Sequence, residues 1–193
     1  RSLIIAGNSP MGKKLAKEAN DGTLTWKDLN EAKWGLESTS SAAGYMYPSQ
    51  WLTDNFKHSI RDLKNTVTMD SYDSAMAQLA SGQIDVMPEY ADARLDEATK
   101  WTTIFGAKGS IWDDTNVIGV TPAIANDGIM VSEKSKIMTP EFKKALSTAI
   151  KDMSKTAEGK KVIAIYSHDG YVDSTKDDYK TAIKVANEMS KAN

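Results

Sequence analysis

The stretch TVTMDSYDSAMAQLASGQIDVM, residues 66–87, indicates the fold class of this chain. Its two ends, residues 66–69 and 84–87, are short apolar runs typical of buried strands, and the segment between them has the spacing of a helix. Because the strand, the helix and the second strand follow one another without long loops, the two strands are expected to run parallel with a right-handed crossover. The sequence therefore predicts a βαβ unit in which these two strands are neighbours.

The helix of this unit has its own start and stop signals. Either Asp70 or Ser71 can cap its first turn, and Gly82 fits the left-handed conformation in which many helices end. Four small or apolar side chains share one of its faces: Ala75, Met76, Leu79 and Ala80. These signals predict an amphipathic helix that packs on a sheet.

The rest of the chain alternates apolar runs with helical patterns, which favours an α/β fold with helices flanking a mostly parallel central sheet. Residues 139–153 begin with a capping threonine and a proline at the first helical position, and they predict the clearest helix. A last helix is expected at about residues 178–191. Residues 94–120 have a weaker pattern and are expected to be irregular, and residues 129–131 look like a strand.

Composition and charge exclude several classes of protein. The 193 residues include 24 basic and 26 acidic side chains without a basic block, so a nucleic-acid partner is not expected. No apolar run reaches the roughly 18 residues of a membrane span. With no cysteine and only His58 and His168, neither a thiolate site nor a histidine-rich metal site is expected. We predict no metal and no cofactor.

The N-terminal segment provides one enzymatic alternative. Gly7, Gly12 and Lys13 match the first seven positions of the phosphate-loop pattern G-x-x-x-x-G-K-[ST], but Lys14 stands where that pattern has a magnesium-binding hydroxyl. Pro10 also removes one backbone N–H that such a loop directs at phosphate oxygens. A nucleotide-binding enzyme therefore remains the alternative. The sequence has no Gly-x-Ser-x-Gly or His-Glu-x-x-His motif, and we predict that the protein is not an enzyme.

Hydroxyl residues at positions 38–41 precede a small-residue segment and an aromatic-rich helix. Unpaired N–H groups at a helix start can hold an anion, and serine hydroxyls add further donors. Inside a helix the ring of Pro48 would press on the carbonyl of Gly44, so the regular helix is expected to begin near Tyr47 or Pro48, or to have a broken first turn. The sequence predicts an exposed, donor-rich turn over residues 38–47, with a serine-capped helix that binds nothing as the alternative.

Polar side chains follow the second strand of the βαβ unit. Glu89, Tyr90 and Asp92 come directly after it, at the strand end where open α/β sheets bind their ligands. A carboxylate there can pair with an amine of a ligand, and a solvated loop acid is the alternative. Asn126 lies in a predicted turn, and turn formation alone also explains it.

Ten motifs lie in order along the chain. They are Trp26-Lys27-Asp28-Leu29, Trp34-Gly35, Ser41 with Gly44-Tyr45 and Pro48, and residues 71–75, 79–86, 89–94, 111–112, 116–121, 125–127 and 166–171. Together they cover nearly the whole sequence, and they resemble the phosphate/phosphite/phosphonate ABC-transporter substrate-binding proteins. The later motifs resemble a subgroup of that family.

The resemblance implies a type 2 periplasmic-binding-protein fold, in which two α/β lobes close on a ligand. It also implies that the serine-rich turn holds a phosphoryl-like oxyanion. The donors would be Ser41, Ala43, Gly44 and Tyr45, and Tyr72 would flank the anion. Two hydroxyls of the family pattern are alanines in this turn, and Tyr72 stands where many relatives have histidine.

The resemblance further implies that most of the first lobe is missing from this chain. We expect the end of that lobe and a crossover in residues 1–22, the second α/β lobe in residues 23–125, and a return crossover with C-terminal helices in residues 126–193. A lobe without its partner could also bind no ligand, which is a third alternative.

The function implied is that of an extracytoplasmic, monomeric solute-binding component of an ABC importer, which works with a membrane permease. A signal or lipid anchor would lie in sequence missing from this chain. Its solute would be a small phosphonate or phosphate-like oxyanion. The expected ligand-binding residues are Ser40, Ser41, Ala43, Gly44, Tyr45, Tyr72, Glu89, Tyr90, Asp92 and Asn126.

Overall fold

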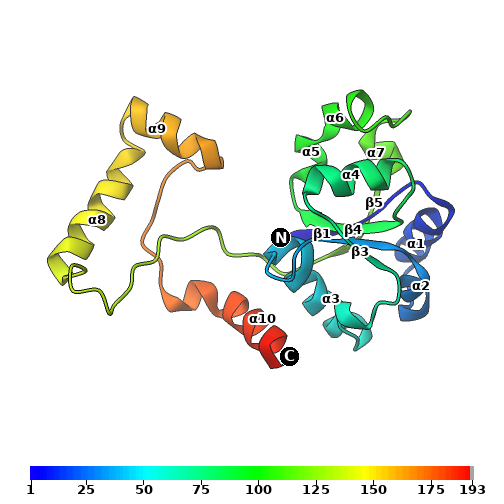
Figure 1. Cartoon of the computed structure of the whole chain (residues 1–193), viewed down its shortest axis with the longest axis horizontal. Helices are drawn as coiled ribbons and strands as arrows, with labels where there is room; N and C mark the ends of the chain where they lie inside the picture. The colour runs from blue at the N-terminus through cyan, green and yellow to red at the C-terminus, as the bar shows by residue number, and fades with distance from the viewer. Residues whose placement is uncertain (192–193) are drawn as a thin grey trace. The chain divides into compact units, whose positions relative to one another are not determined.

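The computed structural model describes residues 1–191 as two compact units (Figure 1). The first unit comprises Arg1–Ile124 together with the C-terminal helix from Thr181 onward, and the second comprises Ala125–Lys180. Strand β1 and helix α1, which were expected to end a first lobe, pack within the unit that holds the sheet. The assignment of residues 1–22 to a first lobe stays a prediction.

The first unit is built on one five-stranded sheet with the strand order β3-β2-β4-β1-β5. The strands are β1 (Ser2–Ala6), β2 (Trp34–Leu36), β3 (Thr66–Thr68), β4 (Val86–Tyr90) and β5 (Asn116–Val120). Strand β2 pairs in parallel with β3 and β4, whereas β1 is antiparallel to both β4 and β5. Four strands therefore run in one direction and only β1 opposes them, which confirms the predicted α/β class with a mostly parallel sheet.

The prediction that the two strands of the βαβ unit are neighbours is wrong. Strand β2 lies between β3 and β4, and Trp34 pairs with Thr66 on one side and with Val86 on the other. All three residues of β2 are buried, so the strand is too short and too uniform to show an alternating pattern. Strand β5, in the segment expected to be irregular, was missed as well.

Helices cover both faces of the sheet, and successive side chains of β1, an inner strand, point to opposite sides. Ile4 packs with α1 (Pro10–Asp21), α2 (Trp26–Glu31) and α3 (Tyr47–Phe56), and Ile5 packs with α4 (Tyr72–Ala80), α5 (Ala93–Asp96), α6 (Ala98–Thr103) and α7 (Ile111–Asp114). Figure 1 shows α4, α5 and α6 on one face of the sheet and α3 on the other. The partly buried Met189 of α10 (Lys180–Lys191) packs against the α1–α3 side.

The local signals of the βαβ unit are confirmed. Ser71, and not Asp70, caps α4 by accepting the N–H of Ser74 at 3.2 Å. Gly82 has a φ of 73° and follows the helix in the left-handed conformation. Both signals depend only on adjacent residues, which is why the sequence shows them.

The second unit consists of helices and extended chain. Its elements are α8 (Pro140–Met153), α9 (Ala157–Ile163) and the 3-10 turns η3 (Ala164–Tyr166) and η4 (Lys176–Tyr179). Thr139 caps α8 as predicted, and its side chain accepts the N–H of Phe142. The strand expected at residues 129–131 is wrong, because that segment is exposed, has no regular secondary structure and pairs with no strand among the described residues. In residues 1–191 no helix is long and apolar enough to cross a membrane.

Candidate functional site

The serine-rich stretch forms a π-helical turn, Ala42–Met46, that continues directly into α3. The N–H of Met46 donates to the carbonyl of Ser41 at 2.9 Å, and the N–H of Tyr47 donates to the carbonyl of Ala42. The next residue, Pro48, has no N–H to continue this pattern. The buried hydroxyl of Ser2 donates instead to the carbonyl of Ala43 at 2.7 Å. The π-helical turn thus accommodates a proline near the start of the helix.

The exposed turn predicted for residues 38–47 is wrong in part. Only residues 38–40 are exposed, whereas Ala43, Gly44 and Tyr45 are buried. Gly44 does not have a positive φ. It must be glycine because a Cβ at this position would lie 2.4 Å from both Cβ and Cγ of Glu37. The segment is buried because the π turn packs against β4 and β1.

The turn still provides several hydrogen-bond donors. The Ser41 hydroxyl accepts the N–H of Gly44 at 3.0 Å, and it lies 3.1 Å from the hydroxyl of Tyr72. In the described part of the chain, no hydrogen bond uses the N–H groups of Ala42 and Ala43. One hydroxyl proton is used between Ser41 and Tyr72, so the second is also available. Two amides and one hydroxyl can therefore donate to an anion here.

Tyr72 is half-buried, and its ring meets that of Tyr90 edge-on with 5.5 Å between the centroids. The Tyr90 hydroxyl donates to Asp96 at 3.0 Å, and burial together with that bond raises the pKa of Tyr90 well above its ordinary value. Burial also raises the pKa of Tyr72. Because the Tyr90 hydroxyl already donates its proton to Asp96, it is not a donor for an anion. The ring of Tyr90 contributes by packing against that of Tyr72. Tyr45 packs into the hydrophobic core.

Glu89 and Tyr90 do not follow the strand as predicted, because β4 extends to Tyr90 and both residues pair with β1. Glu89 is fully buried, and neither of its carboxylate oxygens has a hydrogen-bond partner among the described residues. Burial raises its pKa from 4.5 to about 9, and the nearby charge of Glu37 adds to the rise. The backbone N–H of Tyr90 opposes this rise without meeting hydrogen-bond geometry. A buried acid without partners is costly, and such groups are frequent at functional sites.

Two further polar groups were missed by the sequence reasoning. Glu37 directly follows β2, its Oε1 atom is buried without a partner, and burial together with Asp70 raises its pKa. The hydroxyl of Tyr47 is also buried without a partner, and burial raises its pKa. Glu37 could have been found as an acidic residue at the carboxyl end of a strand, where open α/β sheets bind ligands. That signal requires β2 to be recognised as a strand.

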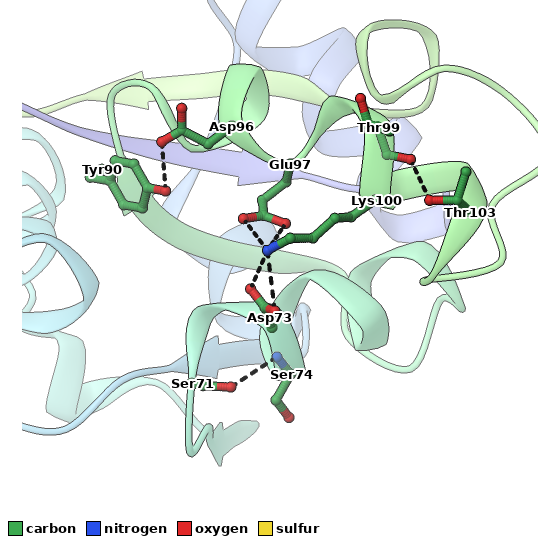
Figure 2. A network of polar contacts seen from close by, with 9 residues as sticks. All are labelled: Ser71, Asp73, Ser74, Tyr90, Asp96, Glu97, Thr99, Lys100 and Thr103. Carbon is green, nitrogen blue, oxygen red and sulfur yellow. Dashed lines mark hydrogen bonds and ion pairs between the residues drawn. The ribbon is translucent and has the colours of Figure 1, made fainter. Parts of the chain in front are cut away.

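Lys100 links two helices through ion pairs with two acidic side chains (Figure 2). The ammonium group of Lys100 lies 3.0 Å from the carboxylate of the buried Glu97 and 3.3 Å from that of Asp73. It thereby links α4 to the start of α6. The charges of Glu97 and Asp73 also add to the rise in the pKa of the buried Glu89.

The remaining predicted site residues, Ser40, Asp92 and Asn126, are exposed. Ser40 is exposed, and its hydroxyl lies 3.0 Å from that of Ser38. Asp92 is exposed, and its side chain does not cap α5. Asn126 is exposed and belongs to the second unit. The structure thus brings together Ser41, Gly44 and Tyr72 around the turn, with Glu89 within electrostatic reach of Tyr72.

A hollow of about 230 Å³ lies beside the turn on the β3 side. Among the predicted site residues only Tyr45 lines it. The other residues that line it are Leu36, Glu37, Ser38, Thr39, Ile60, Arg61, Leu63, Thr66 and Thr68. The hollow is therefore distinct from the hydroxyl pair of Ser41 and Tyr72.

The N-terminal glycine segment does not form a phosphate loop. The N–H of Gly7 donates to the carbonyl of Asp85 at 2.9 Å, and the N–H of Gly12 donates to the Ser9 hydroxyl at 3.0 Å. The N–H of Lys13 donates to the carbonyl of Ser9. A Cβ on Gly12 would lie 2.2 Å from the carbonyl oxygen of Gly7, so close packing of this turn accounts for the glycine. These amides are occupied and cannot hold a phosphate.

Several solved structures have a fold similar to that of this chain. A binding component of an ABC phosphonate transporter from Pseudomonas aeruginosa is 17% identical with a TM-score of 0.61, and the match covers 98% of this chain and 57% of that one. PhnD1 from Prochlorococcus marinus, solved with methylphosphonate, is 15% identical with a TM-score of 0.64, and 98% of this chain and 66% of that one are covered. A Xanthomonas citri protein bound to ATP is 13% identical with a TM-score of 0.69 at the same coverages. At these identities the likeness shows the fold.

The chain spans 57–66% of the length of these structural neighbours. No curated protein sequence matches it. Residues 1–179 match the sequence model of a family described as the phosphonate ABC transporter periplasmic substrate-binding protein. Because that match covers most of the chain, the protein belongs to the family of periplasmic substrate-binding proteins of phosphonate ABC transporters.

Proposed function

We propose that this protein is the extracytoplasmic solute-binding component of an ABC importer, and that it holds a small phosphonate or phosphate-like oxyanion at the turn of residues 41–45. It delivers that solute to the membrane permease of the importer. The family supports the transport role, and the turn supports the class of solute. The protein acts by binding and carries out no reaction on the solute.

The observation that carries the proposal is the set of donors at the start of the helix. Two free amides, of Ala42 and Ala43, directly follow Ser41 in the turn. The hydroxyl of Ser41 is in turn paired with that of Tyr72. An anion there gains hydrogen bonds and the favourable end of the helix dipole without a basic side chain. The turn has alanines where the family pattern has two hydroxyls, so the backbone takes a larger share of the binding.

Glu89 and Asp92 are the groups that we assign to a cationic end of the solute. An ammonium group beside Glu89 would lower the pKa of that carboxyl and supply the partner that it lacks. Asp92 is exposed two residues after β4 and contributes through charge alone. A solute without an amine would leave both acids unchanged.

The experiment is calorimetric titration of the 193-residue chain with methylphosphonate. Loss of one hydrogen bond from Ser41 to a charged acceptor is expected to weaken binding roughly ten- to a hundredfold in the variant Ser41→Ala. Ser110→Ala is the matched control, because Ser110 caps α7 by accepting an N–H three residues later, as Ser41 does in the turn.

The control variant should bind methylphosphonate as tightly as the parent chain. Circular dichroism establishes that both variants fold. A parent chain that binds no methylphosphonate, or a Ser41→Ala variant with unchanged affinity, contradicts the proposed site.

A further inference from the structure

Glu37 lies against the oxyanion turn. Its Cβ and Cγ atoms occupy the space beside Gly44 in which a side chain at that position would lie. Its Oε1 atom is buried, and no ion pair or hydrogen bond to this atom is formed in residues 1–191. An acidic side chain thus lies next to the amides that we assign to an anion, a position where its charge would oppose binding.

The groups around Glu37 are mostly acidic. Asp70, which precedes α4, raises the pKa of Glu37, and the charge of Glu37 in turn raises the pKa values of Tyr72 on α4 and Glu89 on β4. Arg61 and Tyr45 line the same hollow as Glu37. Glu89 is fully buried and also lacks hydrogen-bond partners, and its carboxyl group is close enough to that of Glu37 for the two charges to repel each other. Two such acids are less costly when at least one of them holds a proton or accepts a hydrogen bond from a ligand.

Hydrogen-bond chemistry decides which oxyanions can approach this carboxyl group. An ionised carboxylate accepts hydrogen bonds and cannot donate them, and the same is true of a fully ionised oxyanion. The two can meet only when one proton is shared between them. A phosphonate, like a phosphate monoester with a second pKa of about 6, carries such a proton in its singly ionised form. A sulfonate has none.

We propose that Glu37 determines specificity by accepting the proton of a singly protonated phosphonate or phosphate group, and that it thereby discriminates against sulfonates. The inference rests on the proposed function, because it assumes that the oxyanion binds at the turn. It assigns to Glu37 the recognition of the protonation state, while the amides and hydroxyls recognise the charge. The proton stays between the two oxygens, whichever of them holds it.

The first test uses the pH dependence of the unmodified chain. Methylphosphonate and methanesulfonate are titrated into it by calorimetry between pH 5 and pH 8. Methanesulfonate binding requires that Glu37 takes up a proton from solvent, so its affinity should fall by up to about tenfold per pH unit above the pKa of Glu37. Methylphosphonate supplies its own proton, so its affinity should stay level until its second ionisation. Equal pH dependence of the two affinities would overturn the inference.

The second test uses the variant Glu37→Gln, which keeps the shape of the side chain and adds an N–H donor. The preference of the parent chain for methylphosphonate over methanesulfonate at pH 7 should fall by at least about tenfold in this variant, and the pH dependence of methanesulfonate binding should be lost. Asp70→Asn is the matched control. It removes a nearby charge of the same sign from an exposed side chain, and the preference should remain.

The two hypotheses fail in different ways. An unchanged preference in Glu37→Gln overturns the role of Glu37 and leaves the oxyanion turn in place. Absence of methylphosphonate binding to the parent chain overturns the proposed function itself and the inference with it.

Discussion

The phenolic oxygen of Tyr72 lies 3.1 Å from the hydroxyl oxygen of Ser41, across 31 positions of the sequence. This contact joins the start of α4 to the serine-rich turn. Ser41 already accepts the N–H of Gly44, so its own proton and that of Tyr72 are shared between the partner hydroxyl and any incoming anion.

Replacing Tyr72 by phenylalanine should therefore weaken methylphosphonate binding. The aromatic packing against Tyr90 remains in Tyr72→Phe, and one donor near the anion is lost, so a roughly tenfold decrease in affinity is expected. Calorimetry measures it, with Tyr179→Phe in the second unit as the control. Equal affinities for parent and Tyr72→Phe would show that this hydroxyl only positions Ser41.

The buried acid Glu89 should make the stability of the fold depend on pH. Its pKa is 4.5 ordinarily and about 9 in the folded chain, so between these values the folded state keeps a proton that the unfolded chain releases. The free energy of unfolding should fall as pH rises through this window, by up to about 1.4 kcal/mol per pH unit. Glu89→Gln stays neutral and should lose this dependence.

Urea unfolding at pH 5, 6, 7 and 8 measures the difference between the parent chain and Glu89→Gln. The variant should gain stability relative to the parent at each step. Glu31→Gln, at an exposed acid, is the control and should follow the parent. Parallel curves for the parent and Glu89→Gln would mean that Glu89 is ionised in the folded chain near neutral pH.

Gly44 should tolerate no side chain while Glu37 is present. The added methyl group of Gly44→Ala would lie 2.4 Å from the Glu37 stem, and we expect a loss of about 1 to 3 kcal/mol of stability. In a Glu37→Ala background the γ-carbon and carboxyl group are gone, and the same substitution should cost less. Thermal unfolding of the four chains measures the coupling. Additive effects would mean that Gly44 is required for another reason.

The buried hydroxyl of Ser2 should be required for stability. Ser2→Ala leaves the Ala43 carbonyl without its partner and should cost about 1 to 3 kcal/mol. Ser81→Ala removes an exposed hydroxyl that also donates to a backbone carbonyl, and it should cost much less. Chemical unfolding compares the two variants, and equal costs would show that water replaces the Ser2 hydroxyl.

Local signals made much of the fold predictable. Ser71 and Thr139 cap their helices and Gly82 follows α4, because caps depend on groups within a few residues of one another. The last helix was also expected close to its position, since η4 and α10 together span residues 176–191. The class of fold follows from how such elements alternate.

The sheet order could not be predicted in the same way. Strand β2 has three residues, all buried, and its place between β3 and β4 depends on pairing with segments about 30 and 50 positions away. The same holds for the candidate site. The cap at Ser41 is local, whereas the isolation of Glu89 and the contact of Glu37 with Gly44 depend on how distant elements pack. Sequence patterns contain little information about such contacts.

The bond between Ser2 and Ala43 has a consequence for how relatives of this protein can diverge. The Ala43 carbonyl needs the Ser2 hydroxyl because Pro48 has no N–H to offer it. A lineage that loses the proline can form an ordinary helical turn and is released from the need for a hydroxyl at position 2. The two positions, 46 residues apart in the sequence, are therefore expected to change together during evolution.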